Sequence, residues 1–172
     1  MMKPIIVKEL NIQIQEELYS AYLYQSIAAY AKSKSLDGFA NWFDIQVKEE
    51  MDHARGFYNY ILDRGEKVEL LEIAKPPTDF KGVEVLFVES LKHEKHVTSR
   101  IHGLYTLAEK EGDVALKSFL KWYIDEQVEE EASASMYIDK VKMAGSQGLL
   151  LIDQELAARV YTPSSILGPN EA

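Results

Sequence analysis

Cysteine is absent from the sequence, and its absence excludes disulfides, thiolate nucleophiles, iron–sulfur clusters and thiolate metal sites. Histidine and carboxylate are then the only strong metal ligands that the chain offers. Long apolar runs are also missing. No segment approaches the roughly 20 apolar residues of a membrane span, and the N-terminus lacks the apolar stretch and cleavage site of a secretory signal. We therefore expect a soluble cytoplasmic protein with no membrane partner.

Basic residues are scarce. Lysine and arginine number 19 against 28 acids, the net charge is -9, and neither end carries an arm rich in lysine or arginine. This balance argues against binding to the phosphate backbone of a nucleic acid. Cations are the more natural partners of such a chain.

Glycine and proline are also scarce, at 9 and 5 residues, and they divide the chain into long segments whose apolar residues recur in steps of three and four. Such steps predict amphipathic helices. The first helix is expected over about 5–34, the second from a cap at Asp37 or a neighbouring serine to Arg64-Gly65. The third is expected over about 82–110, and the fourth from a cap at Asp113 to Gly145.

Residues 65–81 contain a Pro-Pro pair and no helical period, which predicts a long connection crossing the length of a bundle. A short fifth helix is expected over about 147–160 and a tail over 161–172. The sequence thus predicts one all-α domain over 1–172, a four-helix bundle at about 5–145 with one long crossover.

A polar residue interrupts the apolar stripe of each predicted helix near its midpoint. Midpoints of helices in an up-and-down bundle share one layer, so these side chains should converge. The six residues are Glu17, Glu50, His53, Glu94, Gln127 and Glu130.

A single acid on an apolar stripe is more often a residue at the rim than a ligand. Four acids in one layer are different, because buried carboxylates lose solvation and repel one another unless cations or protons compensate them. Four glutamates and a neutral histidine carry a charge of -4, which two divalent ions would cancel, and Glu50 and Glu130 could each bridge both. Such ligands suit iron or manganese and, with less discrimination, zinc. Without metal, the layer should hold shared protons and raised carboxylate pKa values.

Four stretches resemble the non-haem ferritins of bacteria and archaea: "EELYSAYLYQ", "KEEMDHA", "KHEKHV" and "FLKWYIDEQVEEE". The likeness spans about residues 5–160 and implies a ferritin-like four-helix bundle. It also implies that Glu17, Glu50 and His53 hold one iron, and that Glu50, Glu94 and Glu130 hold a second, with Gln127 beside it.

The resemblance gives roles to further residues. Glu49, Glu126 and Glu129, with Glu130 shared, look like the third iron site of bacterial ferritins, although acidic runs are also common on solvated helix faces. Tyr24 matches a tyrosine beside the dinuclear centre that hydrogen-bonds a ligand or supplies an electron, and its alternative role is core packing.

Two related groups differ from this sequence. Haem-containing bacterioferritins and rubrerythrin-like di-iron proteins carry a second Glu-x-x-His motif on the fourth helix, where this chain reads "QVEE". Met51 stands where bacterioferritins place a haem-ligating methionine, but non-haem ferritins can also have methionine there, so no haem is expected. His93, His96 and His102 fall off the inward layer and are expected at a surface or an interface.

The resemblance implies an iron-storage ferritin. It would oxidise Fe(II) with O₂ or H₂O₂ at the dinuclear ferroxidase centre and store ferric oxide inside a homo-oligomeric shell of 24 subunits. A di-iron oxidase or oxygenase of the same fold without storage is the main alternative. A metal-free bundle would need basic residues on the inward layer, and a DNA-protecting mini-ferritin would need a basic tail and ligands between subunits.

Overall fold

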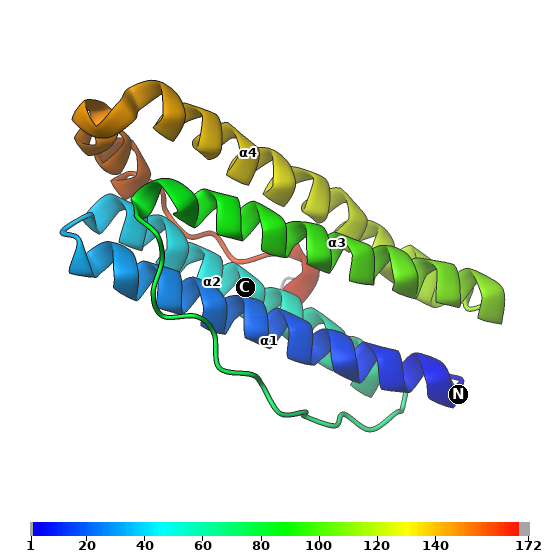
Figure 1. The fold of residues 1–172 in the computed structure, drawn as a ribbon. Coiled ribbons are helices and arrows are strands. Elements are labelled where there is room, and N and C mark those ends of the chain that lie inside the picture. Colours follow the sequence, from blue (N-terminus) through cyan, green and yellow to red (C-terminus); the bar gives the residue numbers. More distant parts are fainter. Residues whose placement is uncertain (1, 169–172) are drawn as a thin grey trace.

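A computed structural model of the chain describes residues 2–168, which form a bundle of long helices (Figure 1). The four α-helices are α1 (Pro4–Ser33), α2 (Asp37–Asp63), α3 (Leu86–Glu111) and α4 (Val114–Ala157). Two short 3₁₀ turns are η1 (Val83–Val85), which leads into α3, and η2 (Ser165–Leu167), near the C-terminus. The expected all-α bundle is confirmed, and no helix within residues 2–168 is long and apolar enough to cross a membrane.

The connection between α2 and α3 runs back along the bundle, as expected, so that α2 and α3 point the same way (Figure 1). It is fastened to α1 at two places. The Glu69 amide donates to Asn11 Oδ1 at 2.7 Å, and Ser26 Oγ donates to the Pro77 carbonyl at 2.6 Å. The antiparallel pairs α1–α2 and α3–α4 make the most extensive contacts in the bundle.

Helix α4 contains a kink at Gly145, where φ is 56° and ψ is -172°. Glycine tolerates this left-handed backbone because it lacks a Cβ atom. The segment after the kink is the expected fifth helix, but it ends at Ala157 rather than near residue 160. Of the expected tail, residues 169–172 lie outside the described part of the chain.

The N-terminus of α2 is capped by a residue that the sequence did not suggest. Neither Asp37 nor a neighbouring serine caps the helix; Leu36 occupies the N-cap without a side-chain hydrogen bond. Asp153, in the segment after the kink, accepts from the amides of Gly38 and Phe39 at 2.8 and 3.0 Å. The expectation at Asp37 was therefore wrong, because a tertiary contact satisfies these amides. The Asp113 cap of α4 is confirmed, with Oδ1 accepting from the Leu116 amide at 3.0 Å.

The apolar core is divided into two clusters along the length of the bundle. One contains Tyr24, Phe39 and Phe87, and the other contains Leu10, Phe57 and Ile101. Apart from Asn11 and Gln13 on α1, the buried polar side chains of the four helices lie between the two clusters in sequence. This division positions a polar layer near mid-length, where carbon would otherwise fill the bundle.

Candidate metal centre

The six side chains expected to converge are all buried. Each of them is at most 6% exposed, and each lies between the two apolar clusters: Glu17, Glu50, His53, Glu94, Gln127 and Glu130. The helical period brings them to the interior because each continues the inward stripe of its helix. We refer to these six residues as the polar layer.

Glu17, Glu50 and His53 form a compact group of ligand atoms. One donor atom from each lies within 4.8 Å of the other two. His53 Nδ1 is 3.2 Å from Glu50 Oε2. Glu17 Oε2 and His53 Nε2 are buried without any hydrogen-bond partner, and unpartnered buried acceptors are costly. Carboxylate oxygens and an imidazole nitrogen whose lone pairs have no partner fit a divalent cation.

Glu94 lies on the α3 side of the polar layer and is held by two neighbours. The Tyr24 hydroxyl donates to Glu94 Oε1, and Gln127 Nε2 donates to Glu94 Oε2 at 3.0 Å. Ser90 Oγ in turn donates to the Tyr24 oxygen at 3.3 Å. The structure thus brings together Tyr24, Gln127 and Glu94, three residues that the sequence had placed at the site.

Glu130 is bound to a residue that the sequence analysis did not select. Gln46 Nε2 donates to Glu130 Oε2 at 2.9 Å. Within residues 2–168, the close group of three ligand atoms comprises Glu17, Glu50 and His53, and it includes neither Glu94 nor Glu130. The second set of ligands therefore shares the layer, and its grouping around a metal remains a prediction.

Burial raises the pKa of every carboxyl in the polar layer. Loss of solvation is the largest cause throughout. It raises the pKa of Glu17 to about 7, against an opposing effect of His53. It also raises the pKa of Glu94, and it holds the pKa values of Glu50 and Glu130 well above their usual range, with the other acids adding to the shift. Without metal the layer therefore retains protons, as the sequence led us to expect.

The three outer acids differ in their surroundings. Both oxygens of Glu49 accept from Arg159 Nη2, at 3.0 and 2.7 Å. Glu126 is half-buried, with Oε1 4.0 Å from His53 Nε2, and Glu129 is exposed. The structure places Glu126 beside the polar layer and pairs Glu49 with a cation of the chain itself.

Several residues with contacts at the site were not selected from the sequence. Gln13 Nε2 donates to Glu17 Oε1 at 2.9 Å, and the Tyr123 hydroxyl donates to the His53 carbonyl at 2.8 Å. The others include Gln46, Ser90, Thr98 and Arg159. A glutamine on the inward face of a predicted helix indicates a buried hydrogen bond, because its amide must find partners in the interior. The sequence does not show which residue is the partner.

The remaining histidines lie off the polar layer, as expected. His93 is half-buried, with Nε2 2.7 Å from Ser20 Oγ, and burial lowers its pKa to about 4. His96 pairs with Glu16 at 3.0 Å, and His102 is exposed.

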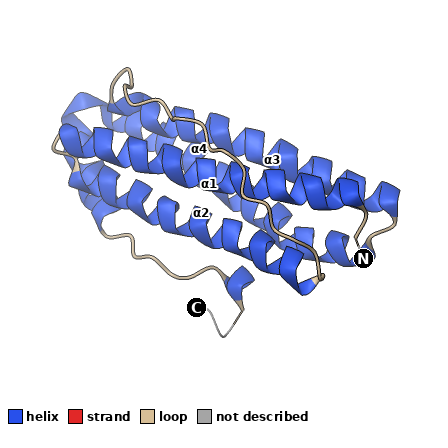
Figure 2. Ribbon diagram, turned by 90° about the horizontal axis from the view of Figure 1, so that it is seen from below, coloured by secondary structure: helices blue, strands red, loops and turns tan. Residues whose placement is uncertain are grey.

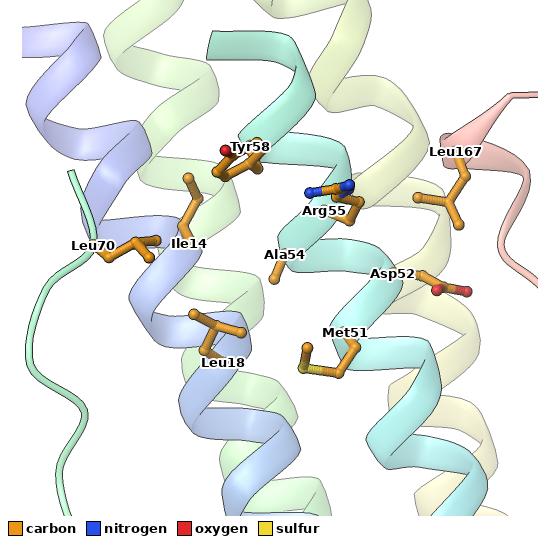
Figure 3. Close-up of a pocket in the computed structure, with 9 residues that line it drawn as sticks. All are labelled: Ile14, Leu18, Met51, Asp52, Ala54, Arg55, Tyr58, Leu70 and Leu167. Carbon is orange, nitrogen blue, oxygen red and sulfur yellow. The ribbon is translucent and has the colours of Figure 1, made fainter. Parts of the chain in front are cut away.

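Met51 lies away from the polar layer, in a surface groove. The groove measures about 640 Å³ and runs between α1 and α2. Figure 3 shows Leu18 and Met51 on its two sides, with Asp52 and Leu167 at one edge. Met51 is 49% exposed, and it therefore makes no contribution to the interior site.

Comparisons with known proteins place this geometry in context. Residues 7–144 match the family described as Ferritin-like domain. The Bacterial non-heme ferritin of Staphylococcus haemolyticus is 40% identical over 163 residues, which cover 94% of this chain and 98% of that protein. The protein of the same name from Staphylococcus aureus is 39% identical over 163 residues, with the same coverage.

Solved structures give the same result. A humanized archaeal ferritin superposes with a TM-score of 0.93 at 41% identity, covering 95% of this chain and 100% of that one. An open pore ferritin from the hyperthermophilic archaeon Archaeoglobus fulgidus superposes with a TM-score of 0.91 at 41% identity, covering 92% and 98%. The similarity therefore extends over nearly the whole chain in both sequence and fold.

Proposed function

The chain belongs to the ferritin family, and from this premise we propose that it oxidises Fe(II) in the polar layer and stores the ferric product. The observation that carries the proposal is the interruption of the core by four carboxyls and an imidazole, with Glu17 Oε2 and His53 Nε2 left without partners. A core that served packing alone would fill this layer with carbon, because uncompensated buried carboxylates are unfavourable.

The proposed ligands divide into two overlapping sets. Glu17, Glu50 and His53 hold one Fe(II), and their donor atoms already lie within 4.8 Å of one another. Glu50, Glu94 and Glu130 hold the second, with Gln127 beside it. Binding of the second ion at the Glu94 and Glu130 carboxyls releases the protons that burial retains there.

The proposed reaction balances with two Fe(II) ions. Together they supply two electrons, which with two protons reduce one O₂ to H₂O₂ or reduce one H₂O₂ to two molecules of water. Carboxylates are hard ligands and stabilise Fe(III) more than Fe(II), so the ligand set favours oxidation. Tyr24 orients Glu94 through its hydroxyl.

Storage requires an enclosed volume, and we assign it to a homo-oligomeric shell in the cytoplasm. A shell of 24 chains of 19.6 kDa would have a mass of about 470 kDa. The net charge of -9 suits a surface that attracts Fe(II). A sedimentation mass near that of a monomer or dimer would contradict storage, and loading with hundreds of iron ions per shell would separate it from a di-iron oxidase.

The variant Glu94→Ala tests the chemistry of the layer. Stopped-flow absorbance should show that Fe(II) oxidation slows by about tenfold or more, because one ligand of the second ion is lost. Glu89→Ala is the matched control, since this acid lies on the same helix with a side chain 44% exposed. Oxidation at the native rate in Glu94→Ala would refute the dinuclear assignment.

A further inference from the structure

The chain continues past the fifth helical segment as a strap, residues 158–168, which runs along α2 (Figure 2). Asp52 Oδ2 accepts from the Tyr161 hydroxyl at 2.7 Å and from the Ser164 amide at 2.9 Å. Trp122 Nε1 on α4 donates to Ser165 Oγ at 2.9 Å. The strap is therefore fixed to both helices that carry the outer acids.

Arg159 is the second residue of this strap, and its guanidinium lies at the edge of the polar layer. Nη2 contacts both oxygens of Glu49, at 3.0 and 2.7 Å, while Nη1 donates to Gln46 Oε1 at 2.6 Å and to the Trp42 carbonyl at 3.3 Å. The guanidinium also lies over the Trp42 ring, 4.7 Å from its centroid. These contacts hold the guanidinium in one position, although 28% of the side chain stays exposed.

The guanidinium is connected to the metal centre through a single side chain. Gln46 accepts from Arg159 through Oε1 and donates to Glu130 Oε2 through Nε2. Gln46 is fully buried, so its amide has no water to exchange with. Arg159 therefore fixes both Glu49 and, through Gln46, the orientation of Glu130.

An unpartnered nitrogen points to the same outer acids from within the layer. His53 Nε2 is 98% buried as a side chain and lacks a hydrogen bond, and it lies 4.0 Å from Glu126 Oε1. Glu126, beside His53, and Glu49, beside Arg159, thus both lie at the edge of the polar layer. A metal ion leaving the layer here would need Glu49 oxygens that the guanidinium already holds.

We propose that Arg159 is a tethered cation that competes with a third metal ion for Glu49. The inference rests on the proposed function, because the competing ion is one that passes between the dinuclear centre and the outer acids Glu49, Glu126 and Glu129. A guanidinium that neutralises Glu49 lowers the affinity of this outer position directly, whereas it reaches the inner ligand Glu130 only through Gln46. Arg159 is a positioning residue and does not contact the reacting ions.

The test is a calorimetric titration of the metal-free protein with Zn²⁺, which binds such ligands and undergoes no redox change. In Arg159→Met the third equivalent should bind at least about tenfold more tightly than in the native protein, while the affinities of the first two change less, because Arg159 reaches Glu130 only through Gln46. Arg159→Lys retains a positive charge and should remain close to native. Arg64→Met is the matched control, because it removes an ion pair with Asp113 that lies 3.0 Å apart and outside the layer.

Crystal structures of Arg159→Met and the native protein with Zn²⁺ should place the tighter third ion on Glu49. Equal third-site affinities in the two proteins, an equal gain in Arg64→Met, or a third ion bound away from Glu49 would each overturn the inference. If Arg159→Met does not fold, Arg159→Gln replaces it, since it also lacks the charge. If the first two equivalents bound in none of the proteins, the dinuclear centre would be refuted. That result differs from each of the outcomes that concern Arg159 alone.

Discussion

The Tyr24 hydroxyl donates a hydrogen bond to the Glu94 carboxylate in the buried layer between the two apolar clusters. Tyr24 and Glu94 come from α1 and α3, and both are at most 1% exposed. The pair joins the aromatic core on one side to a proposed iron ligand on the other.

Tyr24→Phe removes the donor and leaves Glu94 with one fewer partner in the interior. The loss should cost about 1–3 kcal/mol in the free energy of unfolding and slow Fe(II) oxidation about tenfold, because Glu94 loses its orientation. Stopped-flow kinetics and urea denaturation measure the two effects. Tyr137→Phe is the control, since its hydroxyl pairs with Glu155 at 3.5 Å, away from the layer. Equal oxidation rates in both variants would count against the role of Tyr24.

The metal-free protein should lose stability as the pH rises. Burial raises the pKa of Glu17 from 4.5 to about 7, so the folded chain binds a proton that the unfolded chain has released. This contribution is fully present below pH 4.5 and is lost as the pH rises through about 7. Thermal melts in EDTA should show the melting temperature falling across this window. The fall should be smaller in Glu17→Gln, and a native melting temperature that rises with pH would contradict the argument.

Asp153→Ala should destabilise the protein by about 1 kcal/mol, because the amides of Gly38 and Phe39 lose their acceptor. Urea denaturation measures the change. Asp139→Ala is a matched control on the same helix, because Asp139 is exposed. Similar midpoints for the two variants would show that Asp153 is not the effective cap of α2.

Gly56→Ala should destabilise the protein by about 1–3 kcal/mol, because the interior is closely packed at this position. The added Cβ would overlap the Tyr123 hydroxyl and lie 2.8 Å from Ile166 Cγ1 in the strap. Gly103→Ala has no atom within 4 Å of its added Cβ and should stabilise α3 by about 1 kcal/mol. Denaturation midpoints that shift in the same direction would contradict this contrast.

The sequence predicted the bundle and the polar layer because both depend on which residues share one face of a helix. That arrangement can be read from the spacing of apolar and polar residues in a single sequence. It did not predict how the layer is supported. The apolar stripe of α2 favours Val47 as an inward residue, yet Gln46 is fully buried and Val47 only partly so. Gln46 is buried because Glu130 and Arg159 satisfy its amide, and these partners lie 84 and 113 residues away in the chain.

The cap of α2 illustrates the same limit. Capping rules use neighbouring residues, whereas Asp153 reaches Gly38 from 115 residues away. The strap has no periodic pattern either. The ion pair of Arg159 with Glu49 depends on tertiary packing between distant segments, which the residues around Arg159 do not indicate.

The position of Arg159 has a consequence for the order in which the site is synthesised. The last carboxyl of the polar layer to be synthesised is Glu130, and the cation that neutralises Glu49 follows it 29 residues later in the chain. During this interval, the outer acids of the nascent chain have no guanidinium beside them. A chain shortened to end at residue 158 would keep every acid of the layer and of the outer position but lack the cation beside Glu49.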